Sequence, residues 1–538
     1  MGRQQREGCL NFTHATPYAS RRSPVFARNM VATSQPLAAQ AGLSMLARGG
    51  NAVDAALAAA MVLTIVEPTG NGLGSDAFAI LWDGRELHGL NASGRSPAAW
   101  TPERFPGDKM PDRGWESVTV PGAVSAWVDL SKRFGRLPFE TLFEPAIGIA
   151  ERGFCVSPII AEMWRRGGDL LGHHPGFAEC FLPNGRAPRA GELFVNKPIG
   201  ASLRAIAESR GEAFYRGSLA ERIVDFARKH DAALTMADLA EHTNDWCGTI
   251  ATDFDNIALH EIPPNGQGIA ACMALGILRH LPIHDHAPES PQALHLQIEA
   301  MKLAFRDVDA FVSDLRYMTD VRVDHLLSDT YLASRARLVD MSRAQDFGSG
   351  APRLGGTVYL TAADESGMMI SYIQSNYAGF GSGVVVPGTG ISLQNRGLGF
   401  TTRAGHPNQV GPRKRPFHTI IPGFLMRGAE PLMSFGVMGG PMQAQGHVQM
   451  VLRTQMWDQD PQTAVDAPRW RVTSGLKVAI EPAMGEGTLS ALAEMGHEVG
   501  VESPDASYGF GGAQLICRVP GGYVAGSDPR KDGQAVGY

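Results

Sequence analysis

The sequence predicts an α+β fold built in layers, with helices concentrated before residue 350 and strands after it. From about residue 121 to residue 350 helical periodicity dominates, whereas later apolar runs are short and bounded by turn residues, as is typical of strands. No regular alternation of strand and helix is visible, which argues against a parallel doubly wound sheet. With 538 residues, 44% of them hydrophobic and 19% charged, the chain is long enough for one large or two ordinary domains.

The first expected elements are two helices and a strand. Ser34 and Pro36 are typical of a helix start, and the glycines at 49–50 end that helix. A second helix is expected from residue 51 or 54 to residue 66, and the apolar run at 77–82 predicts a buried strand followed by a hairpin turn at 83–84. Four later helices are expected at 123–134, 219–230, 294–308 and 329–339, and strands at 358–363, 368–375, 419–425, 432–437 and 514–519.

Charge and cysteine usage exclude several classes of function. The net charge is −6 and no strongly basic block exists, so nucleic acid is not an expected partner. The six cysteines are scattered, and none shares a CxxC spacing, so reduced thiols in a cytoplasmic protein fit better than a disulfide or metal framework. The first thirty residues carry five arginines without an apolar run or an amphipathic pattern, which argues against a secretory signal and an organelle presequence. The longest apolar run, residues 55–66, is too short to cross a bilayer.

The triplet Gly355-Gly356-Thr357 is the strongest chemical signal. A hydroxyl residue after two glycines, at the head of an apolar strand pattern, suggests a nucleophile exposed by cleavage of the Gly356–Thr357 bond. Cleavage would give Thr357 a free α-amine, with a reference pKa of about 7.7–8.0, that acts as base beside its own hydroxyl. The triplet alone is also typical of an ordinary loop that leads into a strand. The expected hairpin ends at Ser375, whose hydroxyl would then return towards Thr357.

A second glycine segment, residues 436–441, follows an expected strand. Successive backbone N–H groups there are suited to binding one oxygen as an oxyanion hole. The competing interpretation is an ordinary strand-to-helix turn. Three other patterns indicate neither a cofactor nor a metal site. The glycines at 70–74 lie after a helix rather than a strand, and the histidines at 173–174 and 284–286 lack a third ligand at sensible spacing. No cofactor and no metal are therefore expected.

Many separate segments, in order along the chain, resemble the gamma-glutamyltransferase family of N-terminal-nucleophile hydrolases. These segments are Met30–Ala38, Arg48–Ala56, Val120–Val124, Leu137–Phe139, Phe214–Gly217, Glu299–Phe305 and Gly526–Arg530, together with the glycine and threonine motifs above. The resemblance implies a four-layer αββα sandwich, made as a precursor that cuts itself into two interlocked chains. The large piece would comprise residues 1–356 and the small piece residues 357–538, and the two would remain associated.

The resemblance also implies the roles of individual residues. Thr357 matches the nucleophile, Ser375 the hydroxyl that supports it, and Gly439 and Gly440 the oxyanion hole. Ordinary chemistry agrees with these roles, because Thr357 would attack an amide carbonyl and its own amine would pass the proton to the leaving amine. Water or another amine would then release the acyl group.

The chain departs from the family where mainstream members hold the glutamyl group. Arg396 stands where the family has a Glu or Gln, and Gly399 where it has an Asp. Tyr377 occupies the family's Asn position, with Asn376 one residue before it, and His418 and Thr419 replace a serine pair. A guanidinium about 4 Å from a substrate ammonium costs roughly 1–4 kcal/mol, whereas it binds a carboxylate through a planar two-pronged donor. The alternative for Arg396 is a structural ion pair.

The segments at 264–268 and 394–397 look like the amidohydrolase branch of the family, which includes oxamate amidohydrolase and cephalosporin acylase-like proteins. The expected substrate is therefore a small amide with a carboxylate-bearing acyl group, such as oxamate. Glutathione or another γ-glutamyl amide is the alternative, and a non-catalytic scaffold is a remote one. Arg95 lies about two positions from the family's carboxylate-binding Arg and is a weaker candidate for substrate binding. No membrane partner is expected, and a homodimer of the two-piece unit stays open.

Overall fold

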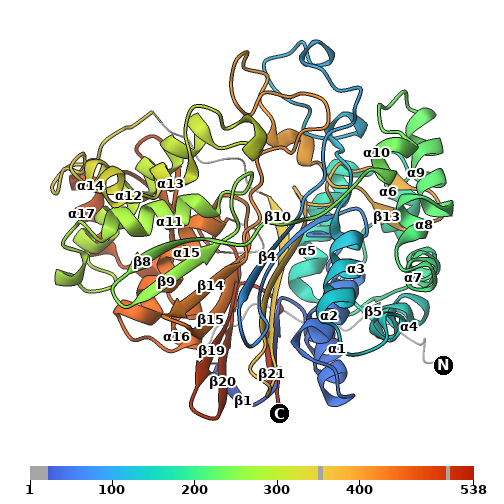
Figure 1. Ribbon diagram of the computed structural model, residues 1–538, viewed down its shortest axis with the longest axis horizontal. Helices are drawn as coiled ribbons and strands as arrows, with labels where there is room; N and C mark the ends of the chain where they lie inside the picture. Colours follow the sequence, from blue (N-terminus) through green and yellow to red (C-terminus); the bar gives the residue numbers. More distant parts are fainter. Residues whose placement is uncertain (1–21, 349–354, 505–508) are drawn as a thin grey trace, which may run out of the picture.

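Two seven-stranded antiparallel sheets stack face to face, and helices cover the outer face of each sheet (Figure 1). The structure is a computed structural model that describes residues 22–348, 355–504 and 509–538. The arginine-rich start considered as a presequence, up to Arg21, lies outside these residues. The layered α+β fold expected from the sequence is confirmed, and so is the four-layer αββα arrangement implied by the family resemblance.

The first sheet carries the Gly-Gly-Thr segment at its centre. Its strands, in spatial order, are β21 (Gln534–Gly537), β2 (Met30–Thr33), β10 (Gly356–Ala363), β11 (Met369–Tyr377), β3 (Asp76–Trp82), β4 (Leu87–Ala92) and β7 (Asp245–Trp246). The second sheet runs β1 (Val25–Ala27), β20 (Gly522–Ser527), β19 (Ala513–Val519), β15 (Glu430–Val437), β14 (Gly423–Arg427), β9 (Ile257–Glu261) and β8 (Ile250–Phe254). Each sheet therefore mixes strands that precede Thr357 with strands that follow it.

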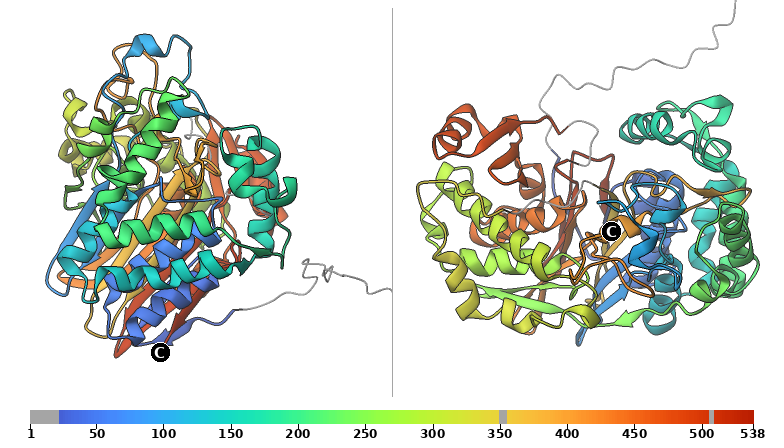
Figure 2. Two further views of the ribbon diagram at one scale, coloured as in Figure 1. Left: turned by 90° about the vertical axis from the view of Figure 1, so that its right-hand side faces the viewer. Right: turned by 90° about the horizontal axis from the view of Figure 1, so that it is seen from above.

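The helices divide between the two outer faces, as the second pair of views also shows (Figure 2). Against the first sheet lie α1 (Pro36–Ala47), α2 (Ala52–Val66) and α3 (Ala123–Phe134), with α4 (Glu144–Arg152), α5 (Pro158–Leu171), α7 (Lys197–Ser209) and α9 (Ser218–Arg228) beyond them. On the second sheet's side lie α11 (Gly268–Leu278), α12 (Pro291–Phe311), α14 (Asp329–Ala336), α15 (Met442–Val451), α16 (Pro461–Asp466) and α17 (Glu486–Glu494). No helix in the described ranges is both long enough and apolar enough to cross a membrane.

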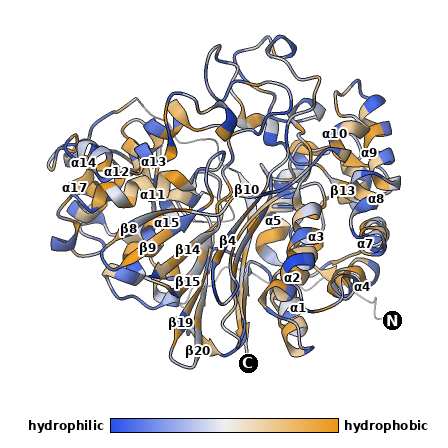
Figure 3. Cartoon of the chain, viewed as in Figure 1, coloured by the Kyte–Doolittle hydropathy of each residue, from blue (hydrophilic) through white to orange (hydrophobic). Residues whose placement is uncertain are grey.

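Alternation along β10 explains how the layers are held together. Val358 and Leu360 pack into the core beneath α2, whereas Tyr359 packs between the two sheets, because successive strand residues point to opposite faces. Hydrophobic residues of these strands accordingly pack on both the helix-facing and the sheet-facing sides, and the central strands carry many hydrophobic residues (Figure 3). All fifteen residues of α2 are buried, which is why its sequence is apolar all round rather than amphipathic.

The expected helices and the hairpin of β10 and β11 are present, but two expectations about strands need correction. The helix-rich middle of the chain also contains the β8–β9 hairpin, which forms an edge of the second sheet. The strand expected at 419–425 is wrong in its first half, because β14 begins only at Gly423. Backbone groups before that point bind side chains instead: the Thr419 carbonyl accepts from Gln267, and the Ile421 N–H donates to Gln443.

Candidate active site

The β10–β11 hairpin places a second hydroxyl beside Thr357. Gly356 pairs with Tyr377 across the hairpin, and Ser375 lies two residues before Tyr377. Thr357 is fully buried, and its Oγ1 lies 3.2 Å from Ser375 Oγ. Ser375 donates its proton to the Gly356 carbonyl oxygen at 2.7 Å, so Thr357 is the donor in the contact between the two hydroxyls. The carbonyl of the bond expected to break is therefore polarised next to the hydroxyl expected to attack it.

Arg396 brings a positive charge to the same hydroxyl pair. Its Nη2 donates to Ser375 Oγ at 3.1 Å and its Nη1 to Thr419 Oγ1 at 2.9 Å. The guanidinium lies over the Tyr377 ring, 4.2 Å from the ring centre, in cation–π geometry. Burial lowers the pKa of Arg396 to about 10, so it remains charged at neutral pH. Its Nε has no hydrogen-bond partner among the described residues.

Asp76, on the strand next to Ser375, forms a buried pair with His418. Asp76 is the residue opposite Ser375 in the register of β3 and β11, and its Oδ2 lies 3.1 Å from His418 Nε2. Burial raises the pKa of Asp76 to about 7, although Arg396 and backbone N–H groups partly offset the effect. Burial, together with the charge of Arg396, holds the pKa of His418 well below its usual range, so this imidazole is neutral.

The second glycine segment forms a turn between β15 and α15. Gly439 and Gly440 have φ angles of 113° and 60°, a backbone conformation that favours glycine. Within the part of the chain that the structure describes, neither N–H group donates a hydrogen bond. Two unpaired amides ahead of a helix are suited to holding an oxyanion. Gln443, the second residue of α15, links this segment to the nucleophile, because its Nε2 lies 3.4 Å from Thr357 Oγ1.

These contacts close into a ring. Thr357 contacts Ser375, and Arg396 bridges Ser375 to Thr419. Gln267 then donates to the carbonyls of Thr419 and Gly440, and the Gly440 carbonyl also accepts from the Gln443 N–H. The structure thus assembles five expected site residues, namely Thr357, Ser375, Arg396, Thr419 and Gly440, around one hydroxyl.

Three residues in or beside this ring were missed from the sequence: Asp76, Gln267 and Gln443. The available signals were weak. Asp76 is a carboxylate at the head of a buried strand, and Gln267 lies in the unusual 264–268 segment. Gln443 is a polar residue in a helix whose described side chains are all buried.

Two expected substrate-binding residues lie elsewhere. The Asn376 side chain bonds to Ser75 and Ser392, and the strand alternation points it to the opposite face from Ser375. Arg95 lines a separate cavity of about 150 Å³, together with Glu241, His242, Arg316 and Arg413. The structure shows no contact between Arg95 and the ring of residues around Thr357.

A larger cavity, of about 380 Å³, opens beside Tyr377. Leu398, Phe400 and Phe417 give it apolar walls, and Lys109 and Arg403 add positive charge. Gly399 also lines it. A Cβ at Gly399 would lie 2.3 Å from the Phe417 carbonyl oxygen, so no side chain fits there without a shift of the backbone. The family's Asp is therefore sterically excluded as well as absent from the sequence.

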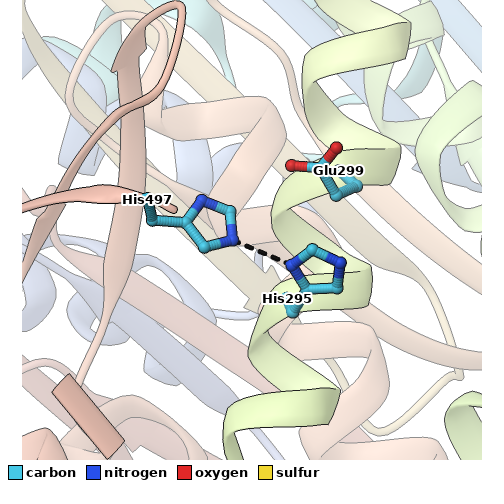
Figure 4. Close-up of side chains that lie close together, drawn as sticks. All are labelled: His295, Glu299 and His497. Carbon is cyan, nitrogen blue, oxygen red and sulfur yellow. Dashed lines mark hydrogen bonds between the residues drawn. The ribbon is translucent and has the colours of Figure 1, made fainter. Parts of the chain in front are cut away.

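The described residues contain two groups with three potential metal ligands close together, and neither includes Thr357. One joins His295 and Glu299 of α12 to His497 (Figure 4). Its atoms are already engaged: His295 Nδ1 lies 2.9 Å from His497 Nε2, and Glu299 accepts from Lys302 Nζ at 2.7 Å. The Lys302 ammonium group beside the Glu299 carboxylate would repel a divalent cation. This cluster therefore fits a buried hydrogen-bond network better than a metal site. The other group, Asp83, Glu86 and His88, lies at the β3–β4 turn, where His88 is buried and its Nε2 already lies 2.9 Å from Asp83 Oδ2.

Comparison with known proteins places this geometry in context. The family model for gamma-glutamyltranspeptidase matches residues 38–538. The glutathione hydrolase-like YwrD proenzyme of Bacillus subtilis (strain 168) is 34% identical over 532 residues, covering 96% of this chain and 99% of that protein. The oxamate amidohydrolase proenzyme of Klebsiella pneumoniae shows the same identity and coverage. The crystal structure of cephalosporin acylase from Bacillus halodurans is 45% identical, with a TM-score of 0.94 over 98% of this chain and 99% of that chain.

Proposed function

Because the chain belongs to the gamma-glutamyltranspeptidase family, we propose that it is a self-processing amidohydrolase with Thr357 as nucleophile. Its relatives in this family include an oxamate amidohydrolase and an acylase, both of which are amide hydrolases. Its substrates are small amides whose acyl part carries a carboxylate, with oxamate as the best example. The proposal includes a single cleavage that divides the chain into residues 1–356 and 357–538. The proenzyme names of its relatives support this cleavage.

The position of Arg396 is the observation that best supports this substrate class. Two consecutive hydrogen bonds, of 3.1 and 3.2 Å, join its guanidinium to Ser375 and Ser375 to Thr357. A carboxylate bound by Arg396 therefore lies close to the carbonyl that Thr357 attacks. Oxamate, in which the carboxylate carbon is bonded directly to the amide carbon, meets that requirement. A γ-glutamyl group would instead bring an ammonium to a site that lacks the family's Asp and carries a guanidinium.

The same residues supply a route for self-cleavage. Thr357 Oγ1 attacks the Gly356 carbonyl carbon while Ser375 donates to the carbonyl oxygen. The bond between the Gly356 carbonyl carbon and the Thr357 nitrogen then breaks, the hydroxyl proton passes to that nitrogen, and Gly356 is left as an ester on the threonine side chain. Water then hydrolyses the ester and leaves Thr357 with a free α-amine.

In turnover, that amine takes the hydroxyl proton as Thr357 attacks the substrate amide. The Gly439 and Gly440 N–H groups stabilise the oxyanion, and the amine passes the proton to the departing ammonia. Water releases the acid from the acyl-enzyme and regenerates Thr357.

A direct comparison of two substrates tests the specificity. Ammonia release from oxamate and aniline release from a γ-glutamyl anilide are measured on one purified sample. We expect the γ-glutamyl substrate to be much the poorer. Equal or faster turnover of it would favour the alternative, a glutathione hydrolase, which the name of the B. subtilis relative supports.

Denaturing electrophoresis and mass spectrometry test the cleavage. Wild-type protein should give two fragments, the second beginning at Thr357, and Thr357→Ala should stay uncut and inactive. A wild-type chain that remains intact while it hydrolyses amides would contradict the proposed nucleophile. An intact and inactive wild-type chain would support the non-catalytic scaffold.

A further inference from the structure

We propose that Asp76, oriented by His418, is the internal counter-charge of Arg396, so that binding of a substrate carboxylate is coupled to uptake of a proton by Asp76. Asp76 would thus be a specificity-determining residue of the site. The inference rests on the proposed function, because it concerns how the same pocket accepts a carboxylate-bearing acyl group.

Strand register and two backbone N–H groups fix the position of Asp76. The β3–β11 register places it opposite Ser375, which bonds to Arg396. Its Oδ1 accepts from the N–H groups of Gly94 and Gly122, at 3.2 and 3.1 Å. Its side chain is fully buried, so it neither rotates into solvent nor is screened by it.

His418 holds the second oxygen of Asp76. The Ile420 N–H donates to His418 Nδ1 at 3.4 Å, which leaves the ring proton on Nε2, where it points at Asp76 Oδ2. The ring also packs against Phe78, with 4.8 Å between ring centres. His418 therefore acts as a fixed neutral donor to Asp76.

The surrounding charges leave Arg396 as the group that Asp76 balances. Arg415 faces Asp76 but is already paired with Asp245. Tyr215 lies near enough to feel the charge of Asp76, and burial raises its pKa so that it stays neutral. The Arg396 guanidinium donates only to hydroxyl groups, and no carboxylate among the described residues forms a hydrogen bond with it. In the cleaved protein the α-amine of Thr357 is a further titratable group facing the pocket.

A substrate carboxylate at Arg396 adds a second negative charge to this buried site. Two carboxylates near one guanidinium repel each other, and a proton on Asp76 removes the repulsion. The raised pKa of Asp76, about 7, means that this proton is readily taken up near neutral pH. Below that pH Asp76 is already neutral and Arg396 is free to bind the substrate. Above it Asp76 is ionised and competes, so the KM for a carboxylate-bearing amide should rise by about tenfold per pH unit.

Calorimetry measures the coupling directly. Oxalate, the acid left when oxamate is hydrolysed, is titrated into the cleaved wild-type protein at about pH 8.5 in buffers that differ in ionisation heat. We expect uptake of nearly one proton per oxalate bound, and much less for Asp76→Asn. Any proton taken up by the Thr357 α-amine persists in that variant. Asp245→Asn is the matched control, since it removes a carboxylate paired with the neighbouring Arg415, and it should keep the wild-type uptake.

A second variant, His418→Phe, keeps the inference testable if Asp76→Asn fails to fold. His418→Phe removes the donor that favours ionised Asp76, so the pH above which KM rises should move upward while kcat changes less. Equal proton uptake by wild type and Asp76→Asn, or an unchanged KM profile in His418→Phe, would overturn the inference. Ammonia release from oxamate by wild type tests the proposed function separately, so the two failures can be told apart.

Discussion

At the scale of single residues, Arg396 decides the charge of the pocket. It is fully buried, stacked on Tyr377 and bonded to two hydroxyls, one of which touches the nucleophile. A structural arginine would be expected to form an ion pair, whereas Arg396 retains an unpaired Nε and only hydroxyl acceptors. That arrangement is suited to receiving an anion from outside the protein.

Arg396→Ala should lose activity on carboxylate-bearing amides. A hydrogen bond to a charged group contributes about 1.5–3 kcal/mol, so kcat/KM for oxamate should fall by roughly tenfold to a hundredfold. Arg403→Ala is the control, because Arg403 is exposed and lines only the adjoining cavity. Steady-state kinetics on fully cleaved protein makes the comparison. Full activity in Arg396→Ala would contradict its role in binding.

Gln443 offers a second test at this scale. Gln443→Glu keeps the oxygen that accepts from the Ile421 N–H but replaces the donor beside Thr357 Oγ1 with a carboxylate oxygen. We expect kcat to fall roughly tenfold or more, because a negative charge opposes the oxyanion, while the melting temperature changes little. An unchanged kcat would show that the 3.4 Å contact does not contribute to the chemistry.

At the scale of elements, local signals predicted helices better than irregular segments. Asn51 and Asp54 form a capping box at the start of α2, as a helix start near these residues requires. The segment before Gly423 has a strand-like sequence, yet its backbone groups bind Gln267 and Gln443. Those partners come from other parts of the chain, so periodicity within the segment does not reveal them.

Asn51→Ala should destabilise the fold through α2. The cap contributes about 0.5–2 kcal/mol, and the variant also loses the bond from Asn51 Nδ2 to the Phe134 carbonyl. Denaturant unfolding measures the loss. Ser157→Ala is the control, because Ser157 stands at the N-cap of α5 without a capping hydrogen bond. Equal stability losses in the two variants would contradict the capping role.

At the scale of the whole molecule, the proposed cleavage would cut a chain whose halves share both sheets. β10 pairs with β2 on one side and with β11 on the other, and β11 pairs with β3. In the second sheet β14 pairs with β9, and β20 pairs with β1. Separation of the two pieces would break these ladders and expose the core between the sheets.

The two fragments should therefore stay together after cleavage. Size-exclusion chromatography under native conditions should give one peak containing both, and only denaturant should separate them. The uncut Thr357→Ala chain is the control, with the same elution volume. Fragments that separate in native buffer would contradict an interlocked unit.

The amino-acid sequence is sufficient to predict the α+β layers, the hairpin that carries Thr357 and Ser375, and the exchange of a family Glu or Gln for Arg396. These features depend on local periodicity and on motifs contiguous in the chain. The three-dimensional structure is needed to show that Asp76 faces Ser375, that Gln267 and Gln443 complete the ring, and that Arg95 lies in another cavity. Strand register and sheet packing bring together residues far apart in sequence, and no local pattern encodes which distant side chain will meet a given hydroxyl.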